Sequence, residues 1–181
     1  MRNSMLTLFL AITAVLYGGM DGVRAQPREA SEYAVKAAFL YHFAKFVEWP
    51  ASSFPDNDTD VAICVLGEDP FGSSLEAMRG KTVGARKVAV KQIEGIEAIK
   101  SCHILFVSES EAKTLEPILG AAQAARVLTV SDMRLFFRSG GMIALFSEKD
   151  KVRFSINAAA AERAGLKISS HLLKLAVMII E

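Results

Sequence analysis

The stretch that decides the fold class is Asp60-Val61-Ala62-Ile63-Cys64-Val65-Leu66, a short and almost continuous apolar run. A loop rich in Ser, Pro, Asp and Asn precedes it at 51–59, and Gly67 follows it. An apolar run of this length between turn residues is typical of a strand buried on both faces, as the strands of parallel sheets are. We therefore predict a strand at 60–66 in the interior of the domain.

Segments of the same character recur along the chain and alternate with helix-like segments. The predicted strands lie at 60–66, 86–91, 102–107 and 126–130, and the predicted helices between them at 70–79, 94–100 and 110–124. Strands that alternate with helices favour a mostly parallel sheet with helices on both faces. The expected fold class is therefore α/β.

Helices are also expected on either side of this alternating region. Residues 32–48 lack Gly and Pro, and Ser31 is suited to cap a helix that begins there. Two further helices are expected, one from Asn157 to Gly165 and one from Ser169 or Ser170 to the C-terminus.

Two strand-like runs, 142–146 and 152–156, are joined by the polar connection 147–151. A short polar connection between two such runs predicts a β-hairpin. The whole prediction is a single α/β domain at 26–181, with a mostly parallel sheet flanked by helices and a C-terminal β-hairpin.

The first 25 residues have a different pattern. Arg2 is followed by the apolar run Met5 to Leu16 and then by small residues ending at Ala25, which is the pattern of a cleavable secretory signal. The apolar run is about a dozen residues long, well short of the roughly 20 needed to cross a bilayer. We therefore predict a signal peptide at 1–25, cleaved near Ala25, and an exported protein.

The balance of basic and acidic residues argues against nucleic acid as a partner. Without residues 1–25, the basic and acidic side chains are equal in number. A protein that binds nucleic acid through phosphate contacts carries an excess of basic residues, which this chain lacks. We expect no nucleic-acid partner and no polybasic attraction to membranes.

No constellation for catalysis, metal or cofactor binding stands out. Cys102 and His103 are adjacent on a predicted strand and so point to opposite faces, which rules out a catalytic pair. The histidines and cysteines lack the spacing of zinc ligands. The segment 56–60 begins like a calcium loop, but Val61 stands where the turn needs Gly. We predict no enzyme activity, no metal and no cofactor.

Cys64 and Cys102, the only cysteines, lie in separate predicted strands. In an exported protein an even number of cysteines favours a disulfide, because the compartment is oxidising. Two buried free thiols that behave as small apolar side chains are the alternative.

Apolar side chains are unusually dense on the predicted helix 32–48 and in the segment 172–180. Helices that pack on the sheet would explain them, but an exposed apolar patch commonly marks a protein-binding site. The residues that we assign to such a site are Phe39, Phe43, Phe46, Trp49, Leu172 and Leu175.

Short motifs along the chain, taken in order, resemble one family. They are Tyr33 with VKAAFLY at 35–41, FAKFVEWP at 43–50, ICVLG at 63–67, CHILF at 102–106, LTVSD at 128–132, GGMI at 140–143, VRF at 152–154 with Ile156-Asn157, LKISS at 166–170 and LLKLA at 172–176. The pattern is similar to that of the YfiR family of exported bacterial proteins, long labelled a domain of unknown function.

The resemblance implies a periplasmic α/β regulator without enzyme activity. Such a protein binds the periplasmic sensor domain of an inner-membrane diguanylate cyclase (YfiN-like) and represses it, which controls cyclic di-GMP and biofilm formation. An outer-membrane lipoprotein (YfiB-like) sequesters the regulator, and family members can form a homodimer. The resemblance also implies that Cys64 and Cys102 form a disulfide.

This sequence departs from some family members, which have a further cysteine pair around the hairpin. Met142 and its neighbours supply no cysteine here. A second hypothesis for the function is a periplasmic small-molecule-binding signalling protein that acts on another sensor. A small-molecule binder should contain a sizeable pocket with convergent polar groups, and a repressor an exposed apolar patch.

Overall fold

A computed structural model describes residues 28–56 and 58–181, so the signal peptide predicted at 1–25 lies outside the described residues. The helices are α1 (Arg28–Phe46), α2 (Ser73–Glu76), α3 (Leu115–Ala124), α4 (Ala158–Arg163) and α5 (Ser170–Leu173), with 3-10 helices η1 (Ala51–Ser53), η2 (Ile96–Ser101) and η3 (Glu109–Thr114). The strands are β1 (Val47–Glu48), β2 (Val61–Leu66), β3 (Thr82–Val83), β4 (Arg86–Ile93), β5 (Ile104–Val107), β6 (Leu128–Ser131), β7 (Ile143–Glu148), β8 (Lys151–Asn157), β9 (Lys167–Ile168) and β10 (Ile179–Ile180).

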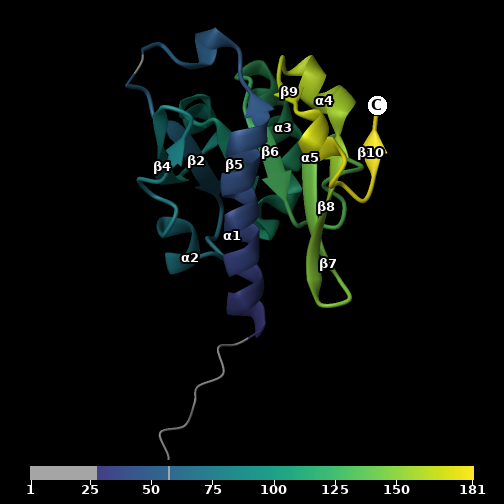
Figure 1. The fold of residues 1–181 in the computed structure, drawn as a ribbon. Helices are drawn as coiled ribbons and strands as arrows, with labels where there is room; N and C mark the ends of the chain where they lie inside the picture. The colour runs from purple at the N-terminus through teal and green to yellow at the C-terminus, as the bar shows by residue number, and fades with distance from the viewer. Residues whose placement is uncertain (1–27, 57) are drawn as a thin grey trace, which may run out of the picture.

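The main sheet has eight strands in the order β10-β8-β7-β6-β5-β2-β4-β3 (Figure 1). Five consecutive strands of this order, from β7 to β4, are parallel. The predicted hairpin pairs β7 with β8 antiparallel, from Ile143 opposite Ile156 to Glu148 opposite Lys151. The α/β class, the single domain and the mostly parallel sheet are therefore confirmed.

Both faces of the sheet are buried, as the run 60–66 predicts. On β2, Val61, Ile63 and Val65 belong to a core shared with α1. Ala62, Cys64 and Leu66 point to the opposite face and pack with η2 and α3. Alternate side chains of a strand face opposite ways, so a strand covered on both sides must be apolar throughout.

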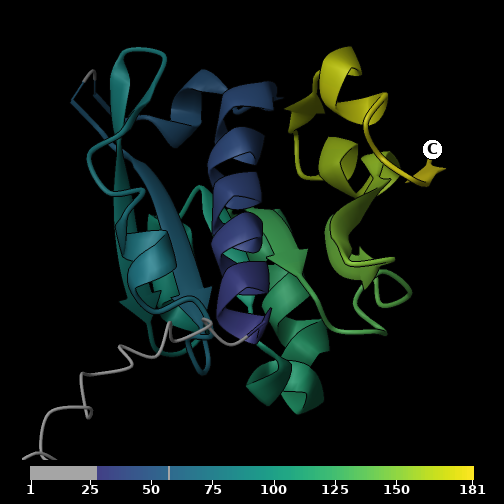
Figure 2. The same ribbon diagram turned by 60° about the horizontal axis from the view of Figure 1, so that its bottom comes forward.

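Helix α1 lies across one face of the sheet, between the β4 side and the C-terminal elements (Figures 1 and 2). Where the helix ends, Val47–Glu48 form a short antiparallel pair with Lys167–Ile168. Within 28–56 and 58–181, no helix has the length and apolar character of a segment that crosses a bilayer.

The predicted C-terminal helix is wrong in extent. Helix α5 covers only Ser170–Leu173, with the Ser169 hydroxyl accepting the amide of Leu172 at 3.2 Å. The chain then turns into β10, which lies parallel to β8 at the edge of the sheet. The β-branched residues Ile179 and Ile180 fit this edge, and pairing with β8 replaces the helical hydrogen bonds.

Two predicted helices between the strands also differ from the structure. The segment predicted at 70–79 contains only the short helix α2, and the segment at 94–100 forms the 3-10 helix η2. Gly72 and Gly95, with φ of 52° and 74°, precede these elements. Both glycines adopt a conformation that a helix interior excludes, so the helices begin late.

Candidate functional site

An exposed apolar surface lies at the C-terminal edge of the sheet, and we call it the tail surface. It consists of Leu175, Val177, Met178, Ile179 and Ile180. Leu175 is 58% exposed and Met178 is 56% exposed, values that a fully packed helix would not leave. No charged residue stands between Leu175 and Ile180. Exposed apolar patches commonly mark interaction surfaces, so the tail surface is a candidate binding site.

The tail surface also carries an open sheet edge. β10 pairs with β8 on one side, where the amide of Val177 donates to Phe154 O at 2.9 Å and that of Ile156 to Met178 O at 2.9 Å. Edge strands normally carry a charge, a proline or a bulge that discourages pairing with another chain. β10 has neither a charge nor a proline, but it is only two residues long, so its free edge offers a short pairing site to another strand.

The six residues assigned to partner binding do not lie on one common surface of the structure. Phe43 has no exposed surface and Leu172 is 2% exposed, so in this structure neither side chain is accessible to a partner. Phe43 packs against Phe154, with ring centroids 5.3 Å apart, and Leu172 belongs to the same core. Both face the sheet, where their burial stabilises the fold.

The other four assigned residues do not form one patch. Phe39, Phe46 and Trp49 are half-buried against the core on the α1 side, and Leu175 lies on the tail surface. Phe46 lies 5.1 Å from the ring of His171, which follows the cap of α5, so the end of α1 and the C-terminal helix are neighbours. Leu175 is thus the assigned residue with the most accessible side chain.

A disulfide joins Cys64 and Cys102, with the Cα atoms 5.9 Å apart. Cys64 lies in the middle of β2, and Cys102 ends the 3-10 helix η2. The bond therefore fastens η2 to the central strand on the face opposite α1. A stable disulfide is consistent with export to an oxidising compartment.

A buried polar cluster fixes α1 to the sheet. Asp132, directly after β6, accepts hydrogen bonds from Lys36 Nζ at 2.6 Å and Tyr33 OH at 2.9 Å. Lys36 also pairs with Glu32 at 2.7 Å. Burial, followed by the hydrogen bond to Asp132, raises the pKa of Tyr33. Each group has a partner, so the cluster is a structural anchor and not a reactive centre.

Sequence reasoning missed this cluster. Ser131-Asp132 has the pattern of a helix start, but turns follow at 134–140, and Ser131 Oγ accepts the amide of Met133 at 3.1 Å. The sequence signal that could have indicated the cluster is Lys36, a charged residue within a mostly apolar stretch of the predicted helix. A lysine at such a position needs a buried partner.

A hollow of about 770 Å³ lies at the carboxyl ends of β2 and β4. Leu66, Ile93 and Ile118 contribute apolar lining, and Glu68 and Glu94 are among its polar residues. Ligands of open α/β sheets bind at this end of the strands. The carboxylates repel a phosphate. Among the described residues, no three metal-ligating side chains come together.

Comparisons with known proteins give a family and a fold. The family model described as YfiR/HmsC-like matches residues 33–177. No curated protein matches this chain.

Among solved structures, a conserved domain protein from Vibrio cholerae O1 biovar El Tor is 11% identical, with a TM-score of 0.57. The match covers 79% of this chain and 59% of that protein, so this chain spans well under two thirds of its length. An ABC domain in complex with L-Trp from Streptococcus pneumoniae is 12% identical, with a TM-score of 0.46 over 66% of this chain and 55% of that one.

At these identities the likeness to solved structures concerns the fold alone. The family model, in contrast, spans the chain from the first turns of α1, through the sheet and the disulfide, to Val177 on the tail surface. The chain belongs to the YfiR/HmsC-like family.

Proposed function

We propose that this protein is a periplasmic regulator without enzyme activity that binds the periplasmic sensor domain of an inner-membrane diguanylate cyclase and represses it. The observation that carries the proposal is the tail surface, an uncharged apolar edge exposed on a member of this family. Burying such side chains in an interface gains about 25 cal/mol per Å² of apolar surface removed from water.

The contact that we propose combines side chains with backbone. Leu175 and Met178 provide apolar anchors, and the free edge of β10 offers hydrogen-bonding groups to an extended segment of the partner. In strand addition the main chain supplies affinity and the side chains supply specificity. Phe46, at the end of α1, contacts His171 of α5, the helix that precedes the tail surface in the chain.

The first test is deletion of the gene. Loss of a repressor should raise cyclic di-GMP and surface attachment, and expression of the full chain should restore both. If cyclic di-GMP does not change on deletion, the repressor proposal is wrong.

Charge placed on the tail surface should abolish repression. In the deletion strain, the L175D/M178D variant should leave cyclic di-GMP as high as no protein at all. Substitution of each anchor should cost about 2 kcal/mol of binding free energy, which weakens binding by roughly 30-fold per residue. Cyclic di-GMP quantification and pull-down of the sensor domain measure the effect.

The matched control is Leu135→Asp. Leu135 is 64% exposed and follows β6, which is three strands away from β10 in the sheet. This variant should repress like the wild type, and both variants should unfold at the wild-type temperature. Equal loss of repression in both would contradict the assignment of the tail surface.

Two further partners belong to the proposal. An outer-membrane lipoprotein (YfiB-like) would relieve repression by sequestering this protein, and a homodimer would form through the same type of edge. Both partners would compete with the cyclase for the apolar side chains of the tail surface. Addition of the lipoprotein's periplasmic domain should therefore release the sensor domain from the pull-down.

The hollow at the carboxyl ends of β2 and β4 favours a second candidate, a small-molecule-binding signalling protein that acts on another sensor. Its volume of about 770 Å³ lies within the range of ligand sites. Gln92→Trp would fill the hollow from an exposed position on β4. Loss of signalling in this variant, with L175D/M178D active, would favour the second candidate.

A further inference from the structure

His103 is a buried polar side chain with a partner at each of its two ring nitrogens. It immediately precedes β5 and is only 6% exposed. Its Nδ1 accepts the backbone amide of Ala62 at 3.1 Å, and its Nε2 lies 3.0 Å from the carbonyl oxygen of Ser53. The ring thus joins the central strand β2 to the 3-10 helix η1.

The two hydrogen bonds determine the protonation state of the ring. An amide N–H can only donate, so Nδ1 must present its lone pair to Ala62. A carbonyl oxygen can only accept, so Nε2 must carry the proton that faces Ser53. Both bonds are satisfied by one neutral tautomer, and a second proton on Nδ1 would face the Ala62 N–H directly.

Aromatic contacts hold the same ring against the segment Ala51–Phe54. Phe54 stacks on His103, with centroids 4.5 Å apart and planes 14° from parallel. Trp49 meets the ring edge-on at 6.0 Å, and its Nε1 donates to the carbonyl oxygen of His103 at 3.2 Å. The guanidinium of Arg86 covers Phe54 at 4.1 Å.

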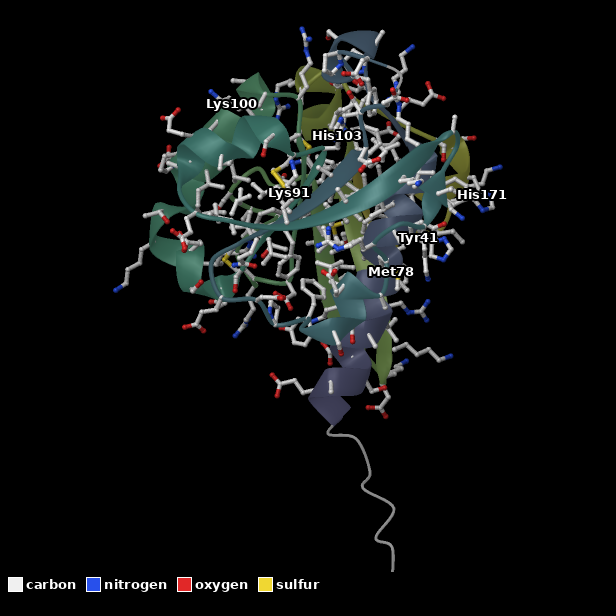
Figure 3. All side chains as sticks on the ribbon, turned by 90° about the vertical axis from the view of Figure 1, so that its left-hand side faces the viewer. Tyr41, Met78, Lys91, Lys100, His103 and His171 are labelled. Atoms are coloured by element: carbon white, nitrogen blue, oxygen red, sulfur yellow. A yellow bond between two sulfur atoms is a disulfide. The ribbon has the colours of Figure 1, made fainter. Side chains whose placement is uncertain are left out.

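The side chains around the ring oppose a positive charge there. Arg86 and Lys91 act on it from β4, and Lys100 and Arg126 line a second hollow that His103 borders. Figure 3 labels Lys91, Lys100 and His103. The carboxylate of Asp56 is engaged by Thr59 at 2.7 Å and by the amide of Asp58 at 3.0 Å. Burial is the largest effect and lowers the pKa of His103; the hydrogen bond to Ser53 O raises this pKa, and the charges of Arg86 and Lys91 lower it further.

The segment that His103 holds contributes little to the core. η1 contains no buried residue, and its internal bonds are single turns, from Ser53 N to Pro50 O at 2.9 Å and from Phe54 N to Ala51 O at 3.0 Å. Segments with few buried contacts open at low free-energy cost. The disulfide and the Lys36–Asp132 pair, in contrast, tie the rest of the domain together independently.

We propose that neutral His103 is a latch between β2 and the segment Ala51–Phe54, and that a proton on Nδ1 breaks the bond to Ala62 and releases the ring and this segment together from β2, while the sheet remains folded. The released state binds one more proton than the latched state. Latching is therefore complete above the ordinary histidine pKa, near 6.5, and weakens as the pH falls from there toward the lowered pKa of the latched state.

Amide hydrogen exchange of the full chain tests the latch between pH 7.5 and 5. After correction for intrinsic exchange, protection of the amides of Ala62, Ser53 and Phe54 should fall by up to about tenfold per pH unit. Amides of β5 and β6 should keep their protection. Trp49, the only tryptophan, should report the same transition by fluorescence.

His103→Asn is the key variant, because an amide oxygen can accept from Ala62 but does not titrate. It should remove the pH dependence of exchange and fluorescence, and the matched controls His42→Asn and His171→Asn, both at exposed positions, should keep it. Nitrogen chemical shifts of the wild-type ring provide a measurement that needs no variant. At pH 7.5 they should show Nε2 protonated and Nδ1 bare.

Three outcomes would overturn the latch. They are a wild-type chain with unchanged protection at pH 5, a transition that persists in His103→Asn, and a ring protonated on Nδ1 at pH 7.5. None of these measurements involves a cyclase, so the latch and the repressor proposal can fail separately.

Discussion

Replacing both Cys64 and Cys102 by alanine should lower the free energy of unfolding by about 4 kcal/mol. The disulfide closes a loop across a sequence separation of 38 residues, and an open loop of that size gains conformational entropy in the unfolded chain. A loss of this size is a large share of the 5–15 kcal/mol that is typical of a domain. Urea unfolding followed by circular dichroism measures it.

The location of the bond predicts which part of the domain loosens first. Cys102 ends η2, and Ile99 within η2 packs in the same core as Cys64. Without the bond, η2 is held by this packing and by the hydrogen bond from Lys91 Nζ to Ser101 O at 3.4 Å, so amides of η2 should exchange faster than those of β6. Reductant should reproduce the effect in the wild type and leave the alanine variant unchanged. A loss of unfolding free energy below about 1 kcal/mol would show that the disulfide hardly constrains the unfolded chain.

Replacing Asp132 by alanine should lower the free energy of unfolding by about 3 kcal/mol, the second large effect that we expect. It removes the acceptor of both Lys36 and Tyr33, and Lys36 is buried among apolar side chains of α1. Removing one partner of a buried ion pair leaves a charge that burial penalises, which typically costs about 3–5 kcal/mol. The low end applies because Glu32 still reaches Lys36 at 2.7 Å.

Two variants control this experiment. Glu32→Ala leaves the Lys36–Asp132 bond in place and should cost about 1 kcal/mol or less, as expected of a partly exposed partner on the same helix. The double variant K36M/D132A removes both charges and should be more stable than D132A alone. If D132A and E32A cost the same, the buried pair does not anchor α1.

Local sequence patterns were sufficient for the interior of the domain. The run 60–66 contains only one polar residue, at its start, so both faces of β2 had to be covered, and β5 repeats this pattern. An unbroken apolar run of this kind indicates a strand that is buried on both faces. The hairpin was equally clear, because its polar connection separates two apolar runs.

Long-range pairing was not visible in the sequence. LLKLAVMII at 172–180 contains good helix formers, but its end becomes β10 because the edge of β8 is free to pair with it. β1 and β9 are pairs of residues too short to leave any pattern. For the same reason the binding assignment mixed Phe43, which faces the core, with Leu175, which faces solvent.

The pairing of β1 with β9 also determines when folding can be completed. Val47, at the end of the first helix, finds its partner Ile168 only after the whole sheet between them has been synthesised. Contacts so distant in sequence slow folding, because a long loop must close before they contribute any stability. The junction between the end of α1 and α5 should therefore be among the last parts of the domain to become fixed, and until then α1 is held only by its contacts with the sheet.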